Sequence, residues 1–226
     1  MFSGFSDETV DFMWGIRFNN ERGWFEDHKE TYLRSFYRPM QALGGEIFEE
    51  IRSQRPDYDL ICKVSRIYRD ARRLHGRGPY KESLWFSVRE PADQWTAKPT
   101  FWFELMPDGW SYGLGYYMPK PVTMAKLRKR IDRDPQRMEK LMRQLNRQEE
   151  FHLETLDYKK PRSEAPSELV APWYQAKSFS IVHEDKLTEE LFSRELVDRL
   201  KAGFRELLPF YDYFVTLDGD PDPREN

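Results

Sequence analysis

The chain of 226 residues is long enough to bury one well-filled core, and its evenly distributed hydrophobic pattern favours a single domain. Aromatic residues make up 15% and charged residues 33% of the chain, a mixture that folds with a strongly polar exterior. The single cysteine, Cys62, excludes an internal disulfide and a cysteine-rich zinc site. No run approaches the roughly 20 apolar residues of a membrane span, and the first ten residues lack the order of a secretion signal. These features predict a cytoplasmic protein with no membrane partner.

Two helices are expected near the N-terminus. Ser6 is placed to cap a first helix that extends to about Phe18, where the Asn19–Asn20 pair and Gly23 interrupt it. A longer helix follows and is closed by Pro56. Its apolar residues recur at steps of three and four and so line one face: Tyr32, Phe36, Met40, Leu43, Ile47 and Ile51.

The middle third of the chain predicts an antiparallel sheet, because short β-rich runs at 84–88, 100–106 and 110–117 are separated by Pro, Gly and Asp clusters. The Pro-Asp-Gly turn at 107–109 predicts a hairpin between the last two runs. Large apolar side chains occupy both faces of 100–106, so we expect both faces to be covered.

Helical periodicity returns over 122–147, with a break expected at Pro135 and a basic outer face. A strand is predicted at 176–183, and a final helix near 193–208. The fold class is therefore α+β, with an antiparallel sheet packed against N-terminal, central and C-terminal helices. Residues 1–217 are expected to form this domain, and the acidic, Pro-rich residues 218–226 a disordered tail.

The densest positive stretch of the chain is 63–81, with seven Lys or Arg residues and a single acid, Asp70. Arg66, Arg69 and Arg72 recur at every third residue. A helical turn would stack their guanidinium groups on one side, whereas a strand would divide them between two faces.

Converging arginines need an anion, and the planar guanidinium suits phosphate or carboxylate because it donates two hydrogen bonds at once and stays charged. The stretch therefore predicts a pocket for a small anionic ligand, in which Asp70 orients the arginines. The candidate ligand-binding residues are Arg66, Arg69, Asp70, Arg72, Tyr80 and Lys81.

Two other interpretations stay open. In the first, the arginines pair with acids in internal salt bridges, and the chain is a structural or protein-interaction module. In the second, nucleic acid binds the basic face of 122–147, with Trp85, Trp95 or Trp110 stacking on bases. Five acids within 122–150 favour simple solvation of that face instead. Its basic residues are Lys126, Lys129, Arg130, Arg133, Arg137, Lys140, Arg143 and Arg147.

Catalysis would require a base or nucleophile beside the arginines, and Asp70 is the leading candidate, followed by His28, His75 and Tyr80. The four histidines show no metal-ligand spacing, so no metal is expected. No phosphate loop, dinucleotide fingerprint or nucleophile elbow is present, so no cofactor is expected and activity is left open.

The segment RIYRDARRLHGRGPYK resembles the hallmark of a bacterial family known as domain of unknown function 2461, which begins R-x-x-R-D-x-R-F and continues with Asp or Asn, Lys and Tyr. The residues that correspond to it are Arg66, Arg69, Asp70, Arg72 and Tyr80. This chain is a divergent member, because Arg73, Arg77 and Gly78 stand where the family has Phe, Asp or Asn, and Lys. The resemblance includes a motif near the N-terminus made of Asn19, Asn20, Trp24 and Phe25. It implies no activity.

Overall fold

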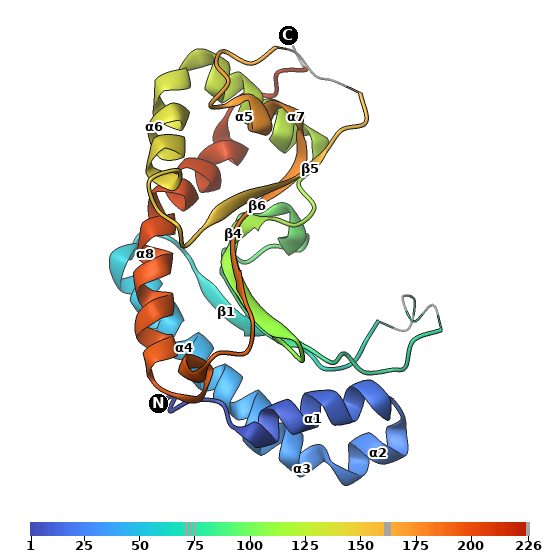
Figure 1. Ribbon diagram of the computed structural model, residues 1–226. Coiled ribbons are helices and arrows are strands. Elements are labelled where there is room, and N and C mark those ends of the chain that lie inside the picture. The colour runs from blue at the N-terminus through green and yellow to red at the C-terminus, as the bar shows by residue number, and fades with distance from the viewer. Residues whose placement is uncertain (71, 73, 75, 161–163, 225–226) are drawn as a thin grey trace. The chain divides into compact units, whose positions relative to one another are not determined.

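The computed structural model describes residues 1–70, 72, 74, 76–160 and 164–224 (Figure 1). Two candidate residues, Arg73 and His75, lie outside the described residues. Within these described residues, six strands form one antiparallel sheet in the order β1-β2-β3-β4-β6-β5, accompanied by helices. The α+β fold class is therefore confirmed.

The chain separates into two compact units. The first unit is made of Met1–Val88, Trp102–Tyr112 and Glu184–Ala202, and the second of Arg89–Phe101, Gly113–His183 and Gly203–Asn226. Whether residues 1–217 act as one domain stays a prediction.

Helix α1 (Asp7–Phe18) opens the first unit and matches the predicted helix. The backbone N–H of Ser6 donates to the Thr9 hydroxyl oxygen over 3.1 Å, which ties the helix start together. The helix ends at Asn19, as expected, but Gly23 lies inside the short helix α2 (Arg22–Asp27) rather than in the break.

The predicted long helix is present as three successive segments: α3 (Lys29–Thr31), a π-helical stretch (Tyr32–Tyr37) and α4 (Arg38–Gln54). Its six predicted core residues are each at most 6% exposed, so the predicted buried face is confirmed. Helix α4 packs on the sheet at Gly44, where a Cβ atom would lie 3.1 Å from the Phe86 ring and 3.2 Å from Cys62 Sγ.

The predicted strands and hairpin are confirmed as β2 (Leu84–Arg89), β3 (Thr100–Met106) and β4 (Gly109–Tyr116), with β3 and β4 adjacent in the sheet. One face of β3 is buried and the other is half-buried, so its two faces are covered unequally. The short strand β1 (Ile61–Val64) and the polar strand β5 (His152–Asp157) were not predicted.

In the second unit, α5 (Pro121–Arg133) and α6 (Pro135–Leu145) meet at the predicted break. Asp134 caps α6 by accepting a hydrogen bond from the Arg137 backbone. The short helix α7 (Ala171–Gln175) leads into β6 (Ala176–Asp185), which confirms the predicted strand. Strand β5 pairs antiparallel with β6, so that Leu153 lies opposite Ile181.

The final helix, α8 (Glu195–Val215), is longer than predicted because it continues through Pro209. Proline costs one helical hydrogen bond, but the turns beyond it carry aromatic side chains that are at most 1% exposed: Phe210, Tyr211, Tyr213 and Phe214. Their burial outweighs the local penalty. Short 3₁₀ turns lie at Trp95–Ala97, Glu189–Phe192 and Thr216–Gly219. Within the described residues, no helix has the combined length and apolar character that crossing a bilayer requires.

Candidate anion-binding site

The arginine-rich segment forms two antiparallel arms in the first unit. Tyr68 and Tyr80 form a β-bridge. The Arg69 N–H donates to the Pro79 carbonyl and the Lys81 N–H to the Ile67 carbonyl, each over 2.7 Å. The backbone around Arg69 is therefore extended rather than helical, and the three-residue repeat does not stack all the arginines on one side.

Asn20, from the turn after α1, braces the second arm. Its side-chain Oδ1 accepts from the Tyr80 N–H over 2.9 Å, and its Nδ2 donates to the Tyr80 carbonyl over 3.0 Å. The amide thus pairs with the backbone as a neighbouring strand would. A Cβ atom at Gly78 would lie 2.2 Å from Asn20 Oδ1, so Gly78 makes room for this brace.

The Tyr80 side chain belongs to an aromatic cluster. It is 2% exposed, and its ring centroid lies 4.3 Å from that of Phe25 and 5.2 Å from that of Tyr68. Burial raises the pKa of the Tyr80 hydroxyl. Tyr80 therefore fixes the second arm against α2, and its contact with a ligand stays a prediction.

Arg72 already has a carboxylate partner inside the segment. Its Nε donates to Asp70 Oδ1 over 3.0 Å and its Nη2 to Asp70 Oδ2 over 2.6 Å. The backbone N–H of Arg72 also donates to Asp70 Oδ1. Because the Arg72 side chain is 88% exposed, this pair contributes little to stability. This pair is what the salt-bridge interpretation predicts, and a role of Asp70 in orienting the arginines for a ligand stays a prediction.

Arg66, Arg69 and Lys81 are in a different situation. Among the described residues, no carboxylate oxygen lies within 4.0 Å of their charged nitrogens. Arg69 Nε donates to the Tyr80 carbonyl over 2.7 Å, and the Lys81 ammonium lies 5.8 Å from the Trp85 ring centroid. The pKa of Lys81 is lowered chiefly by its burial and further by the nearby Arg66 and Arg69 charges, against the opposite effect of Glu104.

Two acids near this group have partners of their own: Glu82, which follows Lys81 in the chain, and Glu104, whose charge acts on Lys81. Glu82 Oε2 lies 3.0 Å from Arg17 Nε, which also binds Asp108 through its Nη1. Glu104 accepts a hydrogen bond from the Ser83 hydroxyl over 2.6 Å. The positive charge of Arg66, Arg69 and Lys81 is therefore only partly compensated. Ser83 and Glu104 were not identified from the sequence as parts of this site.

The basic face of the second unit differs from its prediction at one position. Arg130 was expected on the outer face of the helix but is only 8% exposed. Its guanidinium donates to Asp220 Oδ2, to the Tyr213 and Thr216 carbonyls and to the Thr216 hydroxyl. Arg130 is consequently a structural residue. Trp110, considered as a base-stacking residue, is fully buried.

Among the described residues, no metal-ligand cluster adds a chemical group to the arginine segment, and neither does His28. No group of three His, Cys, Asp or Glu side chains in the described part of the chain could hold a metal ion. His28 stacks on Trp24 with ring centroids 3.9 Å apart, and its Nδ1 contacts the Trp24 carbonyl. Asp70 remains the candidate base, and its carboxylate is engaged by Arg72.

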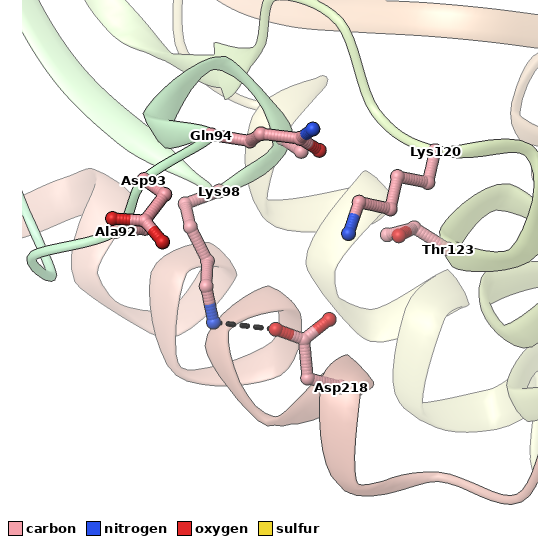
Figure 2. Close-up of a pocket in the computed structure, with 8 residues that line it drawn as sticks. Ala92, Asp93, Gln94, Lys98, Lys120, Thr123 and Asp218 are labelled. Carbon is pink, nitrogen blue, oxygen red and sulfur yellow. Dashed lines mark hydrogen bonds and ion pairs between the residues drawn. The ribbon is translucent and has the colours of Figure 1, made fainter.

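The second unit holds a separate polar pocket of about 330 Å³ that the sequence did not reveal (Figure 2). Its charged residues come from segments up to 125 positions apart, Asp93 and Asp218 being the most distant pair, so no local pattern could have indicated it.

The antiparallel sheet and its helices place the chain among the α+β proteins. Its arginine segment forms an arm held by the Tyr68–Tyr80 bridge. Comparison with protein families gives a match over residues 8–213 to a family described as Conserved hypothetical protein (DUF2461). The chain belongs to this family, which confirms the resemblance of its arginine segment. Comparison with curated proteins found no match. The family description assigns no activity.

Proposed function

We propose that this chain is a cytoplasmic domain that binds a small anion, bearing phosphate or carboxylate, at Arg66, Arg69 and Lys81. One observation carries the proposal: a half-buried ammonium lies near two guanidinium groups, and no carboxylate of the described residues lies within 4.0 Å of any of the three. The proposal narrows the predicted set, because Tyr80 supports the arm and Arg72 is paired with Asp70.

The electrostatics favour an anionic ligand. Like charges repel by about 4 kcal/mol at 4 Å where the effective dielectric constant is about 20, and partial burial of Lys81 weakens the screening by water. An anion that approaches all three groups relieves this repulsion and replaces lost hydration with charge-assisted hydrogen bonds. Relief of repulsion and the new hydrogen bonds both favour binding of an anion, whereas a neutral ligand would not relieve the repulsion or form hydrogen bonds between opposite charges.

Asp70 and Arg72 have a secondary role in this proposal. Asp70 holds the Arg72 guanidinium by two hydrogen bonds at the edge of the segment. A ligand with a second anionic group can compete with Asp70 for Arg72, whereas a single phosphate does not need it. We therefore expect Arg72 to affect binding of pyrophosphate more than binding of phosphate.

Calorimetric titration of the full chain with sulfate, phosphate and pyrophosphate at low ionic strength tests the proposal. Arg66→Gln, Arg69→Gln and Lys81→Met should each weaken binding about tenfold, since each removes one charge-assisted contact. Arg52→Gln is the matched control, because Arg52 is an exposed arginine of the same unit paired with Glu49. Absence of binding by the unmodified chain, or an equal loss in Arg52→Gln, would contradict the proposal.

The interpretation as a structural or interaction module rests on the Arg72–Asp70 pair. It predicts no anion binding at Arg66, Arg69 or Lys81 in the same titration. Nucleic-acid binding by α5 and α6 predicts an affinity that falls steeply with salt and with loss of Lys126 or Lys129. Arg66→Gln would leave that affinity unchanged.

A further inference from the structure

The pocket of about 330 Å³ in the second unit is formed by the turn before β3, the start of α5 and the turn after α8 (Figure 2). Its volume suits a small polar molecule. All of its lining residues belong to the second unit. The polar ones are Asp93, Gln94, Lys98, Lys120, Thr123 and Asp218.

One charge pair of the pocket is already matched. Lys98 Nζ binds the Asp218 carboxylate and also lies 3.8 Å from Glu90 Oε2. The Asp218 main-chain carbonyl accepts from Lys126 Nζ over 2.7 Å. Lys98 and Asp218 therefore form a fixed part of the pocket wall.

Two opposite charges of the pocket have no side-chain partner within the part of the chain that the structure describes. No described residue forms an ion pair or hydrogen bond with the side chain of Asp93 or of Lys120. Figure 2 shows Asp93 on one side of the pocket and Lys120 on the other, its ammonium directed inward. The two groups are more than 4.0 Å apart and do not neutralise each other.

Thr123 adds a polar group on the side of Lys120. The residue is 3% exposed, lines the pocket, and its hydroxyl has no hydrogen-bond partner among the described residues. Figure 2 shows its side chain directed into the pocket from the first turn of α5. The hydroxyl is unpaired within the described residues and borders the pocket, so it is available to a ligand.

We propose that the pocket binds a small zwitterion, with its ammonium group at Asp93 and its carboxylate at Lys120 and Thr123. An amino acid is the simplest compound of this class. The lining lysines and aspartates balance in charge, so a ligand with one charge of each sign matches the pocket, whereas a simple anion or cation matches only one side. This proposal concerns a different unit from the arginine segment and does not depend on it.

The probes are the ω-amino acids β-alanine, 4-aminobutyrate and 6-aminohexanoate, whose charges lie at increasing separations. Butyrate and butylamine each lack one charge of 4-aminobutyrate and serve as matched controls. Exposed ion pairs contribute little individually, so we expect a dissociation constant on the order of 1 mM for the best-fitting length, measured by NMR titration of the full chain. Each single-charge control should bind about 5-fold more weakly or worse.

Substitutions locate the binding. Asp93→Asn and Lys120→Gln should each lower the affinity for the best-fitting amino acid about 5-fold. Asp157→Asn and Lys177→Gln, at exposed positions of the same unit, should leave it unchanged, as should Arg66→Gln in the first unit. The proposal is overturned if no amino acid of the series binds below about 20 mM, if butyrate binds as tightly as 4-aminobutyrate, or if Asp93→Asn and Lys120→Gln both bind like the unmodified chain.

Discussion

Two groups of cations in this chain are used in opposite ways. Arg130 is buried, and its donors reach one carboxylate, one hydroxyl and two main-chain carbonyls. Arg66, Arg69 and Lys81 have no carboxylate of the described residues within 4.0 Å. A buried guanidinium with satisfied donors holds a fold together, whereas a partly buried group with uncompensated charge is suited to a ligand.

The largest effect on stability should come from Arg130→Met. The substitution removes the Arg130 donors from the Tyr213 and Thr216 carbonyls and the Arg130 hydrogen bond from Asp220, so we expect a loss of about 3 kcal/mol in the free energy of unfolding. Urea denaturation measures it. Arg133→Met is the control, because the Arg133 side chain is 65% exposed and 3.8 Å from Asp220, and it should cost less than about 0.5 kcal/mol. Equal losses in the two variants would remove the distinction between Arg130 and its neighbour.

The arm that carries Arg69 and Lys81 is held in place by Asn20, and Gly78 makes room for the Asn20 side chain. Gly78→Ala places a methyl group on the Asn20 side chain, which must then release the Tyr80 backbone. We expect a cost of about 2 kcal/mol in stability, together with weaker phosphate binding, since Arg69 and Lys81 flank this brace. Gly45→Ala is the control, because no atom lies within 4 Å of the new Cβ, and α4 should gain about 0.5 to 1 kcal/mol. A neutral Gly78→Ala would show that the brace is dispensable.

The Arg130–Asp220 pair should make the stability of the chain depend on pH in the acid range. The hydrogen bond from Arg130 lowers the pKa of Asp220, so the folded state binds this proton less readily than the unfolded chain. The stabilisation by Asp220 is therefore complete above the ordinary aspartate pKa and is lost as the pH falls through the lowered value. Compared with Asp220→Asn, the unmodified chain should be about 1 kcal/mol more stable at pH 6, and the two should become nearly equal once the pH is below the lowered Asp220 pKa, by urea denaturation at each pH from 6 downward. A constant difference across this range would assign the effect to something other than the charge of Asp220.

The sequence predicted those parts of the fold that local patterns determine. Helix faces repeat every three to four residues, and the 107–109 turn carries its own backbone preferences, so α1, α4 and the β3–β4 hairpin were found. Strand β5 was missed because it is polar and largely exposed, and gains its structure from pairing with β6. The end of α8 was missed because the aromatic packing beyond Pro209 overrides a local rule.

The same limit applies to the site. Charge density identified Arg66, Arg69 and Lys81, because seven Lys or Arg residues lie within the short stretch 63–81. The sequence does not predict which of these cations lack a carboxylate partner among the described residues. Asp70 forms an ion pair with Arg72, two residues away in the same segment. Arg17 forms an ion pair with Glu82, which is 65 positions away in the sequence, so that pairing depends on the fold and could not be predicted from local sequence.

The smallest expected effect is a change in the protonation of Lys81. Burial and the two arginines lower its pKa, and a bound anion should raise it again by neutralising their charge. Sulfate keeps its charge above pH 8, so its affinity should fall as the pH rises through the lowered Lys81 pKa, in titrations between about pH 8 and pH 10. In Lys81→Arg the side chain stays charged over this range, and the affinity should become independent of pH. If the unmodified chain and Lys81→Arg lose affinity for sulfate in parallel, a group other than Lys81 causes the pH dependence. Lys81 would then not be the cation that binds the anion.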